Sequence, residues 1–218
     1  MTAAIFPQSA EARPSRPPNI RLAVTLALFA WLLIVVSLGA AGAFVGRPRT
    51  PPIAIGIGVT APLVLFFAWL RLSRAFREFL HSLDLRLIAG MHAWRWAGLG
   101  FISLYAHKVL PAVFALPAGL GDMAIGFAAP WMVLALARQP DFAASRRFVR
   151  WNILGILDLI IAISIGTVSA SLATGAPGEI STAAMGTLPL LLIPAFLVPF
   201  FLMLHATALM QSRRLGLR

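Results

Sequence analysis

The sequence has no cysteine, a single lysine and only seven acidic residues among 218. The lack of cysteine excludes disulfide bonds, thiolate nucleophiles and cysteine-bound metals. Charged residues make up 11% of the chain, compared with roughly 25% in ordinary soluble domains, whereas hydrophobic residues make up 60%. Several apolar runs reach the ~20 residues that a bilayer-spanning helix needs. The composition therefore predicts an all-α integral membrane protein.

Short enzymatic motifs are also missing from the sequence. It has no phosphate-binding loop, no GxSxG, no HExxH and no pair of carboxylates spaced for acid–base catalysis. We therefore predict no catalytic residue and no metal site. The sequence favours a protein that is not an enzyme but leaves enzymatic activity open. Among the four histidines, His92 and His205 are the one pair that matching depth would allow for a bis-histidine haem. With a single such pair, no cofactor is expected.

Six apolar runs predict six transmembrane helices within a membrane domain over residues 21–212. The boundary between the third and fourth is placed at a turn over residues 116–119, because Pro117 and Gly119 interrupt the run there. The first run resembles a signal peptide in its flanks, but its apolar core exceeds the usual 7–15 residues, which favours a span. Flexible basic tails are expected at residues 1–20 and 213–218. The predicted spans are 22–44, 53–72, 96–116, 120–137, 151–171 and 188–210.

The segment 72–94 has the pattern of an amphipathic helix. Apolar residues such as Phe76, Leu80 and Leu83 recur at helical spacing, while arginines such as Arg74 and Arg77 fall on the other side. We expect this helix to lie in the cytoplasmic membrane surface, where its arginines contact anionic lipid headgroups.

The positive charge of the chain is concentrated between the predicted spans. The net charge is +11, yet the six-span model leaves only Arg47 and Arg49 on the outer side. Arginine accumulates in cytoplasmic loops, so both termini are predicted to be cytoplasmic. Topology explains the charge, and nucleic acid is therefore not a predicted partner, whereas a second copy of the chain or a membrane partner protein stays open. The abundance of arginine and alanine is typical of GC-rich bacterial genomes, and the predicted location is the bacterial inner membrane.

Ionisable residues inside predicted spans are costly and are candidates for function. At ~1.5 Å per residue, Lys108 and Asp122 lie about 18 Å and about 22 Å from the cytoplasmic boundary. We therefore predict that Lys108 or His107 pairs with Asp122 in a polar intramembrane site. Two plainer interpretations remain: the pair only neutralises buried charges and fixes a helical hairpin, or Asp122 caps the fourth helix.

Helical spacing also predicts which faces of these two spans contact protein. On the third span a stripe of mainly small and polar residues shares one side: Trp96, Gly100, Ser103, His107 and Pro111. On the fourth span Gly126 and Ala129 lie on the side of Asp122, where glycine allows close helix approach.

Asp158 and His205 are the remaining ionisable residues in the predicted spans. Asp158 lies in the cytoplasmic half of the fifth span, where an unpaired carboxyl group binds a proton. Its candidate partners are His205 and, if the third span begins earlier than residue 96, Arg95. Both Asp158 and His205 are therefore predicted as proton-titrating residues.

These observations support three functional classes to different degrees. A small-solute or proton-coupled transport protein fits the buried ionisable residues best. The alternative is a non-catalytic membrane scaffold or complex subunit that uses its basic surface for contacts. A membrane redox or lipid-modifying enzyme has the least support, because no catalytic motif is present.

Overall fold

The computed structural model describes residues 19–216, so the predicted tail at residues 1–20 lies almost wholly outside the described residues, as do residues 217–218. The described part of the chain contains helices and loops but no strand, which confirms the all-α prediction. Five of its helical stretches are long and apolar enough to cross a membrane. They are α1 (Ile20–Ala40), α2 (Ile53–Leu72), α6 (Ala112–Arg138), α7 (Arg146–Leu172) and Ile193–Gly216, which ends in α8 (Val198–Gly216).

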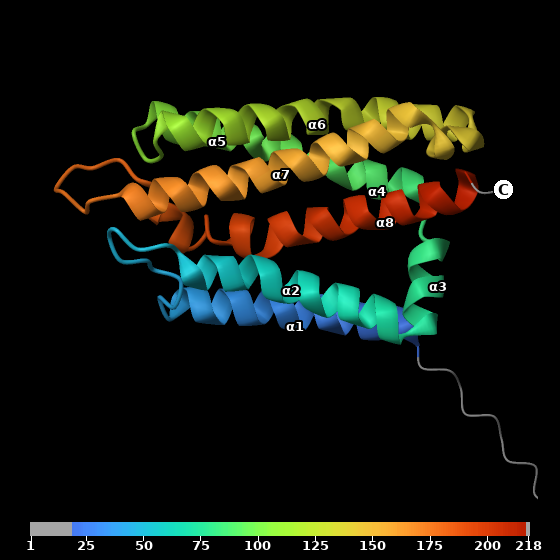
Figure 1. Cartoon of the computed structure of the whole chain (residues 1–218), viewed down its shortest axis with the longest axis horizontal. Helices are drawn as coiled ribbons and strands as arrows, with labels where there is room; N and C mark the ends of the chain where they lie inside the picture. Colours follow the sequence, from blue (N-terminus) through green and yellow to red (C-terminus); the bar gives the residue numbers. More distant parts are fainter. Residues whose placement is uncertain (1–18, 217–218) are drawn as a thin grey trace, which may run out of the picture.

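The long helices form an elongated bundle, shown in Figure 1. Helices α1 and α2 lie on one side, α7 and α8 in the middle, and α6 on the other side. The loops 41–52, 107–111 and 173–187 gather at one end, which we call the loop end. Both described chain ends lie at the opposite end, which we call the basic end. The basic end holds Arg21, Arg71, Arg74, Arg77, Arg86, Arg138, Arg146, Arg147, Arg150, Arg213 and Arg214.

The observed helix bounds coincide with the predicted span in one case and differ from it in the others. The predicted span 53–72 coincides with α2. Helix α7 begins five residues before the predicted span 151–171, because the Ser145 side chain caps it by accepting a hydrogen bond from the backbone N of Phe148 at 3.2 Å. Hydropathy does not detect such a start, since the first turn of α7 is rich in arginine.

The predicted turn over residues 116–119 is wrong, and so are the bounds 96–116 and 120–137 that depend on it. The chain turns at residues 107–111, between α5 (Leu99–Ala106) and α6. Pro111 immediately precedes α6, while Pro117 lies inside it. Proline is tolerated inside membrane helices, and Pro117 does not end α6.

The predicted amphipathic helix 72–94 is divided into separate helices. Helix α3 (Arg74–Ser82) lies across the basic end, where Phe76 and Leu80 are buried against α1, α2 and α8. Asp84 then caps a new helix, α4 (Leu85–Met91), because its Oδ1 accepts a hydrogen bond from the backbone N of Arg86 at 2.8 Å. The second half of the predicted helix therefore belongs to the next segment of the chain.

Residues 85–106 run alongside α6 as three successive short helices: α4, the 3₁₀-helix η1 (His92–Gly98) and α5. A 3₁₀-helix has three residues per turn, which places every third residue on one face. His92, Arg95 and Gly98 form this buried face, and Phe101 in α5 is also buried. The predicted face is wrong: Trp96, Gly100, Ser103 and His107 are exposed and Pro111 is half-buried, because the 3₁₀ turns of η1 set a register in which Arg95 and Gly98 face α6.

Glycines bring η1 unusually close to α6. A Cβ atom on Gly126 would lie 2.7 Å from the backbone N of Trp96, and one on Gly119 would lie 2.7 Å from the carbonyl O of Gly98. Gly126 and Ala129 are buried, which confirms the protein-facing side predicted for this helix. The close approach places the side chain of Arg95 directly beside α6.

Candidate functional site

Arg95 is the centre of a buried ion cluster in the middle of the bundle. It is only 2% exposed. Its Nε donates to Asp122 Oδ1 at 2.6 Å, and its Nη2 donates to Asp158 Oδ2. Asp122 lies ten residues into α6, about 15 Å from the loop end of that helix. Helices α6 and α7 thus place one carboxylate each against a single guanidinium group.

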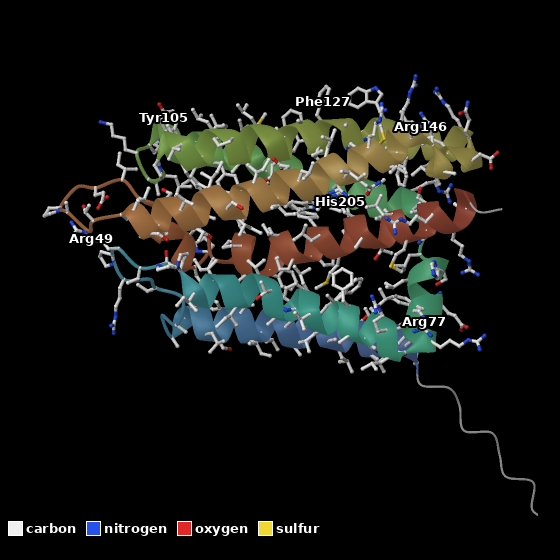
Figure 2. All side chains as sticks on the ribbon, in the orientation of Figure 1. Arg49, Arg77, Tyr105, Phe127, Arg146 and His205 are labelled. Atoms are coloured by element: carbon white, nitrogen blue, oxygen red, sulfur yellow. The ribbon has the colours of Figure 1, made fainter. Side chains whose placement is uncertain are left out.

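A directional chain of hydrogen bonds continues from Arg95 to α8 and α7. Arg95 Nη1 lies 3.3 Å from His205 Nε2, and arginine can only donate, so Nε2 accepts. The neutral ring then carries its proton on Nδ1, which donates to Asn152 Oδ1 at 2.9 Å. The amide nitrogen of Asn152 donates in turn to the carbonyl O of Phe148 at 2.9 Å. Figure 2 shows His205 between Arg49 at the loop end and Arg146 at the basic end.

His92 lies directly against His205. The two rings stack with centroids 3.8 Å apart and an interplanar angle of 17°. His92 is fully buried, and neither of its ring nitrogens has a hydrogen-bond partner among residues 19–216. A haem between two axial histidines needs room for its macrocycle, which rings in direct contact do not leave. This arrangement of His92 and His205 therefore does not fit a haem.

The cluster has an unbalanced formal charge. One guanidinium faces two carboxylates, and His205 is neutral in the observed hydrogen-bond pattern. With both aspartates ionised, the group carries a net charge of −1 in a buried setting. Such a charge is costly unless a proton or a cation neutralises it.

A cavity of about 220 Å³ connects the cluster with the loop end. Asp122 lines it, whereas Arg95 and Asp158 do not. On α7 the cavity follows one face from Ala170 near the loop end to Leu159 beside Asp158. Its lining from α7 comprises Leu159, Ala162, Ile163, Gly166, Thr167 and Ala170, which recur at helical spacing, and Ala173 follows directly after the helix.

Three of the five predicted site residues come together in the structure. Asp122, Asp158 and His205 all gather around Arg95. Arg95 was expected at the cytoplasmic boundary and only as an alternative partner of Asp158. Because the segment starts at residue 85, it carries Arg95 into the middle of the bundle.

The predicted pairing of Asp122 with Lys108 or His107 is wrong. Lys108 is exposed in the turn at the loop end, with a positive φ of 59°. His107 is also exposed, and its Nδ1 lies 2.8 Å from the carbonyl O of Ser103 in its own turn. The earlier start of the segment moves both residues beyond its helical part, well away from the depth of Asp122.

Two features of the cluster were not predicted: the participation of Asn152 and the burial of His92. Asn152, Gly155 and Asp158 recur every three residues on α7, so the polar face was visible in the sequence. Gly155 has a packing role, since a Cβ atom there would overlap the ring of His205. The position of His92 depended on the 3₁₀ geometry of η1, which hydropathy does not indicate.

Long apolar helices around a buried ion cluster are typical of a helical membrane protein with a polar interior site. The chain belongs to the family described as a domain of unknown function, DUF8737, whose model matches residues 52–213. The matched region contains every residue of the cluster and leaves α1 outside it. No curated protein and no solved structure matches the chain. The features of the chain that bear on its function are therefore the cluster and its cavity.

Proposed function

We propose that the protein is a membrane transport protein that binds a small solute in the cavity and exchanges it for a proton at the ion cluster. The observation that supports this most directly is the cavity, which opens at the loop end and has Asp122 in its lining. An ionisable group at the bottom of an accessible cavity is a typical arrangement for coupling solute binding to protonation.

We further propose that the chain crosses the bacterial inner membrane six times, with residues 85–106 as the additional, interrupted crossing. This segment lies beside α6 along its length, and its three short helices are together as long as a spanning helix. The arginines favour the basic end as the cytoplasmic side, with both termini there. In this position α3 lies at the membrane surface, where Arg74 and Arg77 meet anionic headgroups.

Interrupted helices at the cluster and at the cavity support a transport mechanism. The 3₁₀-helix η1 carries Arg95, which contacts the cavity-lining Asp122, and the π-helix η4 (Ile193–Leu197) contributes Ile193 and Pro194 to the cavity lining itself. Helices broken at a central binding site are a recurring feature of secondary transporters. Movement of these segments would open the cluster towards the basic end, which the hydrogen bonds of His205 and Asn152 close in the structure.

Protonation of the cluster gives the coupling its physical basis. When the cavity is empty, one proton bound to the cluster balances the net charge of −1 that the cluster would otherwise carry. A solute that changes this charge balance releases or takes up that proton. Transport of the solute in one direction is then coupled to the movement of a proton in the opposite direction.

Proteoliposomes containing a pH-sensitive dye test the proposal. Panels of amines, amino acids and organic acids are added outside, and the internal pH is followed. We expect at least one solute to evoke proton movement, which Asp122→Asn abolishes and Asp141→Asn retains, because Asp141 is exposed at the basic end. The alternative, a membrane scaffold, predicts a folded wild-type protein that evokes no proton movement with any solute.

A further inference from the structure

We infer that the solute is a monovalent organic cation with an apolar body, which competes with a proton for Asp122. This inference rests on the proposed function, because it assigns a substrate class to the same cavity. It follows from the charge of the cluster, the presence of one of its two carboxylates in the cavity lining and the chemistry of the cavity walls.

The formal charges around Asp122 do not cancel, and the cluster keeps a net negative charge. Arg95 approaches it from η1, and Asp158 lies beside Arg95 from α7. His205 contacts Arg95 and His92 stacks on His205, so neither ring donates to Asp122. A single guanidinium therefore balances only one of the two carboxylates, and the cavity side of the cluster attracts positive charge.

Asp122 is the carboxylate that a solute can reach. Its Oδ1 accepts from Arg95, while no hydrogen bond from the described residues reaches its Oδ2. Asp158 is instead packed against α6, where a Cβ atom on Gly121 would overlap its carboxylate, and it does not line the cavity. The two aspartates thus have different roles: Asp158 neutralises Arg95, and Asp122 faces the solute.

The walls of the cavity select an apolar body. Between the mouth and Asp122 the lining consists mostly of aliphatic and aromatic side chains, including those of Phe44, Phe101 and Phe114. Two charged residues, Arg47 and Glu179, also line the cavity at its exposed mouth, where their opposite formal charges cancel. Glu179 accepts hydrogen bonds from Thr174 and the adjacent backbone amides. An ammonium group at Asp122 with hydrocarbon against these walls satisfies both parts of the site.

Charge balance also favours a cation over an anion or a neutral solute. An anion would add to the net charge of −1, and a neutral solute would leave that charge to a proton. A cation replaces the proton, so binding of one cation releases one proton from the cluster. The exchange is balanced in charge, and no further reactant is needed.

Isothermal titration calorimetry on the full-length protein in detergent tests this inference with three probes of similar size. The probes are benzyltrimethylammonium, N-benzylacetamide and benzylsulfonate, which are cationic, neutral and anionic. Titrations in two buffers of different ionisation enthalpy count the protons released. We expect only the cation to bind with proton release, and its affinity to fall by about tenfold per pH unit on the acid side, where the cluster holds a proton.

Variants assign the binding to Asp122. We expect Asp122→Asn to lower the affinity for benzyltrimethylammonium at least tenfold, whereas Asp141→Asn, a matched change at the exposed basic end, leaves it unchanged. If Asp122→Asn does not fold, the number of protons that the wild-type protein releases on cation binding still tests the competition between cation and proton.

The possible failures are distinguishable. Binding of N-benzylacetamide or benzylsulfonate in preference to the cation overturns the cationic substrate class and leaves the proposed transport function in place. Cation binding without proton release overturns the competition, and the absence of binding by all three probes overturns the inference as a whole. Failure of the transport function itself is measured separately, as the absence of solute-evoked proton movement in proteoliposomes.

Discussion

Arg95 and Asp122 form a buried ion pair that joins η1 to α6, with Arg95 Nε 2.6 Å from Asp122 Oδ1 and side-chain exposures of 1% and 18%. The turn at residues 107–111 folds these two elements against each other, and the glycines of α6 let η1 approach closely enough for the contact. Because Arg95 is buried and Asp122 is largely so, each charge depends on the other for much of its stabilisation.

Removal of the guanidinium should be strongly destabilising. We expect Arg95→Met to cost about 3–5 kcal/mol, because it leaves Asp122 and Asp158 facing each other without a counter-charge. Thermal unfolding of the purified protein, followed by the change in its melting temperature, measures this effect. The triple variant Arg95→Met, Asp122→Asn, Asp158→Asn should recover most of the loss, since no uncompensated charge remains.

An exposed ion pair provides the control for this prediction. Arg74 and Glu78 are 2.8 Å apart with side-chain exposures of 85% and 64%. Arg74→Met should therefore change stability by less than about 1 kcal/mol. If Arg95→Met and Arg74→Met lower the melting temperature equally, the buried cluster does not have the role in stability that its contacts imply.

The close contact between η1 and α6 predicts opposite results for two glycine substitutions. Gly126→Ala would place a methyl group 2.7 Å from the backbone N of Trp96, and backbone cannot move aside as a flexible side chain can. We expect a cost of about 1–3 kcal/mol. At Gly100 nothing lies within 4 Å of the new methyl group, so Gly100→Ala should be neutral or slightly stabilising. Melting temperatures of the two variants test this, and a lower value for Gly100→Ala than for Gly126→Ala would contradict the packing described.

The hydrogen-bond chain predicts the tautomer of His205. Because Arg95 donates to Nε2, the ring proton should reside on Nδ1, with Asn152 as its acceptor. Nitrogen-15 chemical shifts of labelled histidine distinguish the two tautomers at neutral pH. In Asn152→Leu the Nδ1 proton loses its acceptor, at a cost of about 1–3 kcal/mol. A wild-type spectrum with the proton on Nε2 would refute the chain as described.

The fold was largely predictable, because hydropathy alone locates apolar runs of spanning length. Residues 53–72 illustrate this, since the run and α2 coincide. The position of a turn within a continuous apolar run was not predictable, because Pro117 and Gly119 resemble turn residues. Both lie inside α6, where Gly119 permits the close approach of η1. Because the turn was misplaced, Arg95 was predicted outside the bundle and Lys108 inside it. Three members of the cluster were still identified, since any ionisable residue in an apolar run is a candidate, whereas the identity of their partner required the correct helix start at Asp84.

The proposed topology predicts that two loops lie on opposite sides of the membrane. Gly178 lies in the loop after α7, at the loop end, and Ser145 precedes α7 at the basic end. Reporter fusions that are active only in the periplasm should be active at Gly178 and inactive at Ser145. Fusions at Arg49 and at Arg138 serve as controls, because six crossings place them with Gly178 and with Ser145. Equal activity at Gly178 and Ser145 would exclude the proposed six crossings.

The loop at the cavity mouth should depend on pH through Glu179. Hydrogen bonds from the backbone N and the hydroxyl of Thr174, together with the amides of Gly175 and Ala176, lower the pKa of Glu179 below its usual value near 4.5. A lowered pKa in the folded state means that the carboxylate stabilises the loop at and above the usual value. This stabilisation is lost as the pH falls through the lowered value.

Hydrogen–deuterium exchange of the loop 173–181 measures this loss. After correction for intrinsic exchange, protection of the three amides should be constant above pH 5 and should fall in more acidic buffer, since only the ionised carboxylate accepts all of their hydrogen bonds. Glu179→Gln should expose the amides at every pH, whereas Glu78→Gln, at the basic end, should leave them protected. Because Gly175 and Ala176 line the cavity, the same loss of protection should loosen its mouth. Unchanged protection in Glu179→Gln would mean that backbone packing alone holds the loop.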